Sequence, residues 1–255
     1  MNSGRVSVII PVYNCAAFIA QAVESIRAQT DDLLDVVIVD DGSTDGTAEI
    51  VGGLPPAGLH YAYQGNAGPS RARNHGLVLA RGDVIGFLDA DDLWPAGRLR
   101  RQMRVLDEDP SVDVVLGRIQ CVRQAAGEED RLEECFPPFV LLSPTAALFR
   151  RRAFERVGNF DETLRYGEDT DWFMRARECG VRILVEDDVA LLYRRHQRNM
   201  TYGRDMKELR VLDVLKRSLD RRRRHDAVAG PLPSLLHPAP RAAGKPGCCD
   251  PREDA

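Results

Sequence analysis

The sequence predicts an α/β domain in which a mainly parallel central sheet is flanked by helices. Short apolar segments rich in β-branched residues alternate with segments whose apolar residues recur at helical spacing, a pattern typical of βαβ units. Carboxylates follow two of these apolar segments directly, as expected where ligands bind beyond the carboxyl ends of parallel strands. The chain has 255 residues, enough for one such domain with a substantial core.

Two buried strands are expected on either side of a first helix. Val6–Ile10 and Val36–Val39 are almost wholly apolar, as strands buried on both sheet faces are. Pro11 should end the first strand, because proline donates no hydrogen bond to a neighbouring strand. The helix between them is predicted from an apolar stripe at four-residue spacing, Phe18, Ala22 and Ile26.

The alternation of strand and helix continues to residue 88 and then becomes less regular. Leu59–Tyr63 and Val84–Leu88 are the next expected strands, with a helix over 70–80 between them. Further strands are expected at Val112–Leu116, Ala146–Arg150, Arg182–Val185 and Ala190–Tyr193. Ala125–Glu134 is expected to be a charged loop or excursion, and Thr170–Cys179 a helix that Gly180 stops.

Composition and charge narrow the classes of function. Apolar residues make up 44% and charged residues 29% of the chain, the balance of a soluble globular protein. The net charge of −4 argues against nucleic acid as a partner, because nucleic-acid binding usually needs a basic surplus. The first residues do not form a signal peptide, and no apolar stretch approaches the roughly 18 residues of a membrane span. We therefore expect a cytoplasmic protein.

The C-terminal end differs from the rest of the chain. Residues 206–225 are expected to form a basic amphipathic helix, with apolar side chains at helical spacing. Its basic run, Arg221–Arg224, allows two interpretations: a solvated charge run, or peripheral contact with anionic lipid at the inner face of a membrane. Residues 226–255 are rich in Pro, Gly, Ala and charge, which predicts a disordered tail.

Three carboxylates within four residues are the central functional signal. Asp89, Asp91 and Asp92 follow the strand expected at 84–88 and would repel one another unless water or a cation neutralises them. Hard divalent ions such as Mg²⁺ and Mn²⁺ prefer oxygen ligands, commonly one or two carboxylates plus substrate phosphates. The pattern indicates a cation-bound diphosphate, with a solvated acidic turn as the structural alternative.

Two further segments suit the same ligand. Asp40 and Asp41 follow the strand at 36–39 and can accept hydrogen bonds from a nucleoside, or simply end the strand and cap a helix. A Gly-containing loop at 65–69 leads into a helix whose positive end carries Arg71 and Arg73 and attracts phosphate. Together these segments predict a nucleotide site beyond the strand ends.

A third acidic site, Glu168-Asp169, precedes the helix expected at 170–179. Carboxylates at a helix N-terminus are favoured by the helix dipole, which is a sufficient structural reason for them. A carboxylate opposite a bound donor is also what proton abstraction from an acceptor hydroxyl requires. The residues by themselves leave both interpretations open.

Six segments carry a family pattern. They are VSVIIPVYN at 6–14, DDGSTDGT at 40–47, NAGPSRARNHG at 66–76, GDVIGFLDADDLW at 82–94, VGNFDETLRYGEDTDWFMRA at 157–176 and YRRHQRN at 193–199. In this order and spacing the chain resembles the family 2 glycosyltransferases. The resemblance implies one GT-A domain over 1–205, with a nucleotide-sugar-binding half at 1–95 and an acceptor half at 96–205. It also implies inversion at the anomeric carbon and a role in making a cell-surface polysaccharide or glycoconjugate.

The resemblance also assigns roles to individual residues. It places the nucleotide-sugar site at Pro11, Tyr13, Asp40, Asp41, Arg71, Asp89 and Ala90. Asp91 would bind Mn²⁺ or Mg²⁺ directly, with Asp89 and His196 as further metal contacts. Asp169 would be the general base.

The implied donor is a nucleotide-diphosphate-sugar, foremost a UDP-sugar, and the implied acceptor is a sugar, lipid-linked or other hydroxyl. The chain has neither the QxxRW segment nor the transmembrane helices common in polymerising synthases, which predicts a single, non-processive transfer. Two alternatives stay open. A sugar nucleotidyltransferase should show a Gly-rich, Lys-bearing loop where PVYNCAAF stands, and a non-catalytic nucleotide-sugar-binding module could dispense with the base.

Overall fold

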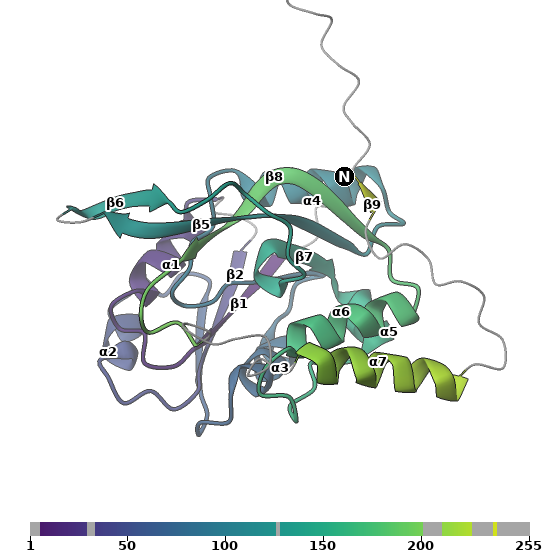
Figure 1. The fold of residues 1–255 in the computed structure, drawn as a ribbon. Helices are drawn as coiled ribbons and strands as arrows, with labels where there is room; N and C mark the ends of the chain where they lie inside the picture. Colours follow the sequence, from purple (N-terminus) through teal and green to yellow (C-terminus); the bar gives the residue numbers. More distant parts are fainter. Residues whose placement is uncertain (1–5, 30–33, 126–127, 201–210, 226–236, 239–255) are drawn as a thin grey trace, which may run out of the picture.

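The fold is built on one mixed β-sheet (Figure 1). A computed structural model describes residues 6–29, 34–125, 128–200, 211–225 and 237–238. Within these ranges the strand order is β3-β2-β1-β4-β7-β5-β8-β9, with β6 paired to β5 outside this path. The strands are β1 (Val6–Val12), β2 (Leu34–Asp40), β3 (Leu59–Tyr63), β4 (Val84–Phe87), β5 (Val114–Ala125), β6 (Glu128–Glu134), β7 (Ala147–Arg150), β8 (Ile183–Arg194) and β9 (His237–Pro238).

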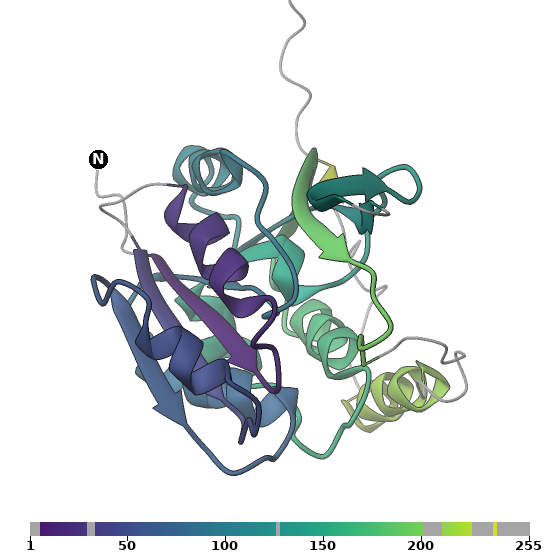
Figure 2. The same ribbon diagram turned by 90° about the vertical axis from the view of Figure 1, so that its left-hand side faces the viewer.

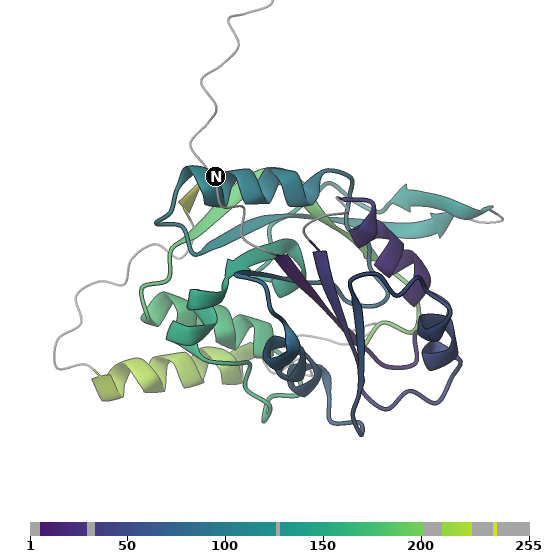
Figure 3. The same cartoon turned by 180° about the vertical axis from the view of Figure 1, so that it is seen from behind.

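Helices cover both faces of the sheet. They are α1 (Ile19–Arg27), α2 (Thr47–Gly52), α3 (Pro69–Leu79), α4 (Arg98–Glu108), α5 (Arg151–Val157), α6 (Glu168–Glu178) and α7 (Val211–His225). Figures 1 and 3 show α1, α2 and α4 on one side of the strands and α3, α5 and α6 on the other, with α7 outside α6. None of the helices in the described ranges is long and apolar enough to cross a membrane.

Strand direction decides which side chains share an edge of the sheet. β1 pairs in parallel with β2 and β4, and β2 pairs in parallel with β3. β7 is antiparallel to both β4 and β5, and β8 is parallel to β5, so β8 runs in the same direction as β1. The carboxyl ends of β1, β2, β4 and β8 therefore lie along one edge, where α/β sheets bind ligands.

Close packing fixes the two helices that reach this edge. α3 lies directly on β1 because Gly76 has no side chain: a Cβ there would lie 2.3 Å from Ile9 Cγ2. On α6, the fully buried Trp172 packs edge-on against Phe149 of β7, with ring centroids 5.2 Å apart. These contacts determine where α3 and the start of α6 lie relative to the strand ends.

The predicted fold class is confirmed, but the predicted end of the first strand is wrong. β1 continues through Pro11 to Val12. Ile9 O accepts a hydrogen bond from Leu88 N–H, so Ile9 and Pro11 face β4, whereas Val12 faces β2. The register of β4 ends opposite Ile9, so no strand needs the N–H group that Pro11 lacks.

Two further corrections concern the C-terminal half. β8 is one strand where two were expected, because it pairs with β5 along most of its length, across register shifts on either side of Arg118. The segment predicted as a charged loop or excursion at 125–134 is part of a hairpin of β5 and β6, which projects from the body in Figures 1 and 3, so a loop is wrong and an excursion is right. Arg131, Leu132 and Glu134 are all exposed. This part of β6 has no buried face that an alternating sequence would reveal.

The structure contains two helices, α4 and α5, that were not predicted from the sequence. α4 buries the polar side chains of Arg98 and Gln102 along with its leucines, which blurs its apolar stripe. α7 forms a helix over 211–225 of the predicted 206–225; residues 201–210 lie outside the described ranges. Within the predicted tail, His237–Pro238 pair with β8 as β9, and 226–236 and 239–255 lie outside the described residues.

Candidate active site

The acidic turn after β4 is held against the end of β8. Leu93 and Leu192 exchange two backbone hydrogen bonds, of 3.1 and 2.9 Å. Asp92 is buried, and its Oδ1 accepts the Arg194 backbone N–H at 2.9 Å. Burial raises the pKa of Asp92 well above its usual value, and the neighbouring carboxylate of Asp91 adds to the rise. The turn therefore lies beside the residues that follow β8.

Asp91 meets His196 and Asn199 at this junction. Asp91 Oδ2 lies 3.1 Å from both His196 Nε2 and Asn199 Nδ2. The His196 ring stacks on Phe18 with centroids 4.7 Å apart. His196 Nδ1 accepts the Arg198 backbone N–H at 3.2 Å, and Nε2 faces Asp91 and Asn199 Nδ2, the latter 3.2 Å away. His196 therefore contacts Asp91 in this structure, and its contact with a metal stays a prediction.

The turn keeps carboxylate oxygens open for a cation. Asp89 Oδ2 and Asp91 Oδ1 have no hydrogen bond to any residue that the structure describes, and the two side chains are 39% and 21% exposed. In the described ranges, no group of three or more His, Cys, Asp and Glu side chains is arranged to hold a metal. A Mg²⁺ or Mn²⁺ site completed by substrate phosphates needs only one or two carboxylates, and this donor set fits it.

A buried arginine joins the acidic turn to the start of α6. Arg73 Nη2 lies 2.9 Å from Asp89 Oδ1, and Arg73 Nη1 lies 2.7 Å from Glu168 Oε1. Burial opposes the charge on Arg73, but the attraction of Asp89 and Glu168 outweighs it and raises the pKa of Arg73. Burial also raises the pKa of Asp89, with Arg73 acting against the rise. These ion pairs tie together the carboxylates on either side of Arg73.

Asp169 lies in the first turn of α6, next to Glu168. Its Oδ1 accepts the Thr170 backbone N–H at 2.6 Å, and its Oδ2 has no hydrogen bond within the described part of the chain. Burial raises the pKa of Asp169 to about 6, and the charge of Glu168 adds to the rise. A carboxyl group with such a pKa is ionised at neutral pH and is a stronger base than an ordinary aspartate.

Asp40 and Asp41 are engaged inside the protein. Asp40 accepts hydrogen bonds from Ser43 N–H and from the Tyr61 hydroxyl, both at 2.7 Å. Asp41 accepts the backbone N–H groups of residues 67 and 68 at 2.9 and 2.8 Å. The two aspartates are 1% and 4% exposed. Asp41 thereby holds the loop before α3 at the end of β2, and neither aspartate caps α2 or α3. The contact of both aspartates with a nucleoside stays a prediction.

The loops after β1 and β2 are held together. Asn14 adopts a positive φ of 52°, and its Oδ1 accepts the Thr44 backbone N–H at 2.8 Å. Tyr13, just beyond β1, is 50% exposed and free to contact a ligand, whereas Pro11 and Ala90 are buried. Of these three predicted contacts, Tyr13 is the one that the structure leaves open at the surface.

Arg71 and Arg73 lie on different sides of α3, because residues two positions apart on a helix point about 200° apart. Arg71 is exposed and lines an open hollow of about 740 Å³, whose other walls include Asn66, His75 and Glu162. Arg73 points inward to its carboxylates. Arg71 therefore stays a candidate for contact with phosphate, and Arg73 does not.

Two contacts of the site were missed by the sequence analysis. One is the link from Asp89 through Arg73 to Glu168, and the other is the bond from Asn199 to Asp91. Arg73 and Asn199 both lie in segments that carry the family pattern. That placement is the only signal the sequence offers, because their partners are set by the order of the strands.

Comparison with known proteins places the chain in a family. The model of glycosyl transferase family 2 matches residues 7–158, more than half of the chain. An uncharacterised glycosyltransferase of Nostoc sp. is 33% identical over 174 residues, which cover 62% of this chain and 54% of the relative. The succinoglycan biosynthesis protein ExoO of Rhizobium meliloti is 34% identical over 208 residues, covering 74% and 60%. The chain thus spans little more than half the length of these relatives.

Solved structures share the fold. S. aureus TarS 1–349 in complex with UDP-GlcNAc has a TM-score of 0.67 and 25% identity, covering 84% of this chain and 65% of that one. The mannosyltransferase PcManGT of Pyrobaculum calidifontis, in complex with GDP-Man and Mn²⁺, has a TM-score of 0.64 and 26% identity, covering 90% and 66%. The family model and these shared folds confirm the resemblance: the chain belongs to glycosyltransferase family 2.

Proposed function

We propose that this chain transfers a sugar from a nucleotide-diphosphate-sugar to an acceptor hydroxyl in a single, inverting displacement. The observation that carries the proposal is the edge where β4, β8 and α6 meet, with open carboxylates on the acidic turn and Asp169 across the Arg73 bridge. Membership of the family supports this class of reaction. The neighbours TarS and PcManGT bind UDP-GlcNAc and GDP-Man, which supports a sugar-nucleotide donor.

The acidic turn would form the leaving-group side of the site. Asp91 would hold Mn²⁺ or Mg²⁺ through Oδ1, and Asp89 would reach the cation through water or contact the ribose. When bound, such a cation stabilises the negative charge on the departing diphosphate. His196 and Asn199 would support this role by holding Asp91 Oδ2, which leaves Oδ1 for the ligand.

Asp169 would form the other side of the site as the general base. It would take the proton of the acceptor hydroxyl as that oxygen attacks C1 on the face opposite the diphosphate. Its Oδ1 is held by Thr170 N–H, so Oδ2 is the oxygen available for the proton. Arg73 would act as a positioning residue, because it fixes Asp89 and Glu168 at the two sides.

The base assignment predicts how turnover depends on pH. A carboxyl group whose pKa is raised to about 6 keeps its proton up to a higher pH than an ordinary aspartate, and a protonated base cannot act. We expect kcat to be level above this pKa and to fall about tenfold for each pH unit below it. The measurement is kcat as a function of pH, followed as release of nucleoside diphosphate at saturating donor and acceptor. If kcat fell only near the usual pKa of aspartate, the assignment of Asp169 as the general base would be contradicted.

The proposal extends to the donor and the acceptor. A UDP-sugar is the proposed donor, and a sugar or lipid-linked hydroxyl is the proposed acceptor. The name of ExoO assigns that relative to succinoglycan biosynthesis, which supports a polysaccharide or glycoconjugate product here.

The proposed function is tested by a donor screen followed by turnover. UDP-, GDP- and dTDP-sugars are compared by thermal shift with and without Mn²⁺, where ligand at roughly 100 Kd should add about 2.7 kcal/mol of stability. The stabilising donor should then yield nucleoside diphosphate only when acceptor is added. Pyrophosphate release from a sugar phosphate and a nucleoside triphosphate would instead identify a nucleotidyltransferase. Binding without turnover over a panel of acceptors would identify a non-catalytic module.

A further inference from the structure

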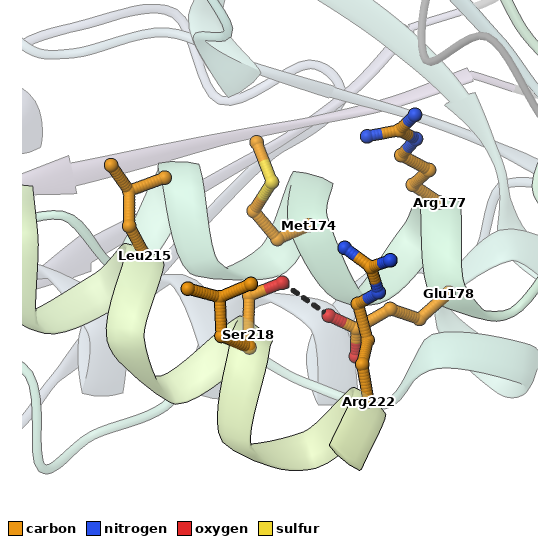
Figure 4. Close-up of a pocket in the computed structure, with 7 residues that line it drawn as sticks. Met174, Arg177, Glu178, Leu215, Ser218 and Arg222 are labelled. Carbon is orange, nitrogen blue, oxygen red and sulfur yellow. Dashed lines mark hydrogen bonds between the residues drawn. The ribbon is translucent and has the colours of Figure 1, made fainter. Parts of the chain in front are cut away.

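Helix α7 packs on the body through polar side chains. Arg221 lies 2.8 Å from Asp171 and 2.8 Å from Glu178 of α6. Ser218 donates a hydrogen bond to Glu178 Oε1 at 2.6 Å (Figure 4). Figures 1 and 2 show α7 at the periphery, alongside α6. The face of α7 that meets the body is therefore largely one of charges and hydrogen bonds.

Three leucines of α7 stay exposed beside this polar face. Leu212, Leu215 and Leu219 are 76%, 40% and 48% exposed, whereas Val214 is fully buried. The three leucines recur at three- and four-residue spacing and so form one stripe. A surface helix ordinarily buries its apolar stripe and exposes its charges. In α7 polar side chains make the contacts with α6 while the leucine stripe stays exposed, which indicates a partner for the stripe outside the described parts of the fold.

Cationic side chains border the leucine stripe. Lys216, Arg222 and Arg223 are all exposed and lie three or four positions from Leu212 or Leu219. Figure 4 shows Arg222, Leu215 and Met174 around a groove between α6 and α7. Leu219 also lines this groove, which has a volume of about 250 Å³. The surface thus combines an apolar strip with positive charge along its borders.

We propose that the leucine stripe and its three cations dock on the surface of a membrane that contains anionic lipid. The leucines would enter the boundary between headgroups and acyl chains, and the cations would pair with lipid phosphates. A second copy of the chain fits less well, because it would bring two sets of like charges together. The inference is independent of the proposed reaction.

The test is sedimentation of the full chain with phosphatidylcholine vesicles, with and without phosphatidylglycerol. We expect binding only when phosphatidylglycerol is present, and weaker binding at high salt. R222E/R223E should lower binding at least tenfold, since each basic side chain near an anionic surface contributes roughly a fivefold factor. L212S/L219S should also lower it, by removing apolar area. Unchanged melting temperatures would show that both variants fold.

The matched control is R100E/R104E, which makes the same charge change on α4. Both arginines are exposed, and Figure 3 shows α4 on the other side of the sheet from α7. This variant should bind as the wild type does. The proposal is overturned by absent binding, by equal binding to vesicles without phosphatidylglycerol, or by an equal loss in the control. A lipid-free dimer, seen by light scattering and dissociated by L212S/L219S, would assign the stripe to a second copy and overturn it too.

Discussion

Asp169→Asn should lower kcat by roughly a hundredfold or more while leaving the affinity for the donor nearly unchanged. The amide has the same shape as the carboxylate but cannot accept the proton of the acceptor hydroxyl. Asp169 is suited to this role because one oxygen is held by Thr170 N–H and the other is open. The measurement is steady-state release of nucleoside diphosphate at saturating donor and acceptor.

The matched control for this variant is Glu168→Gln, which neutralises the neighbouring acid. Glu168 Oε1 is engaged by Arg73, so its loss should affect position more than proton transfer. We expect a smaller fall in kcat than in Asp169→Asn. A nearly normal rate in Asp169→Asn would reject the base assignment, and a larger loss in Glu168→Gln would transfer it to Glu168.

Arg73→Met should lower the free energy of unfolding by about 3–5 kcal/mol, because it leaves the buried carboxylate of Glu168 without its partner. The variant keeps Asp89 and Glu168, which would then lose the guanidinium between them. For a domain of this size the melting temperature should fall by roughly 10 °C. Urea denaturation and calorimetry measure both quantities. Since Arg73 acts to lower the pKa of Asp169, the acid limb of the rate profile should also move to higher pH.

Arg71→Met is the control for this stability prediction. Arg71 is two residues away on the same helix, but its side chain is exposed. A surface change of this kind usually alters stability by no more than about 0.5 kcal/mol. Equal stability of the two variants would show that the bridge from Asp89 to Glu168 does not hold the two sides of the site together.

Three strands of the N-terminal half, β1, β2 and β4, could be predicted because they are buried on both faces. Apolar runs such as Val36–Val39 leave one interpretation, and the structure places them in the parallel strands. β6 could not be predicted, because its exposed residues 131, 132 and 134 carry no apolar alternation. The end of β1 was misjudged because the rule for proline applies only where a neighbouring strand needs the N–H group.

The acidic residues of the candidate site could be predicted from the sequence, but the residues that hold them in place could not. Asp89, Asp91 and Asp169 stand out as charged residues next to strand or helix ends. Arg73 and Asn199 carry no such signal, since their partners come together only when β4, β8 and α6 meet. Asp40 and Asp41 were also recognised as acids after a strand, and their position suggested contact with a ligand. In the structure both carboxylates have hydrogen-bond partners within the protein.

The most direct test compares donor binding in Asp91→Asn and Asp169→Asn by titration calorimetry in the presence and absence of Mn²⁺. We expect Asp91→Asn to lose the Mn²⁺-dependent part of donor binding, because Asp91 Oδ1 is the proposed cation ligand. Asp169→Asn should bind the donor as the wild type does and fail only in turnover. Normal Mn²⁺-dependent binding in Asp91→Asn, or an equal loss of binding in both variants, would contradict the division of the site into a leaving-group side and a base side.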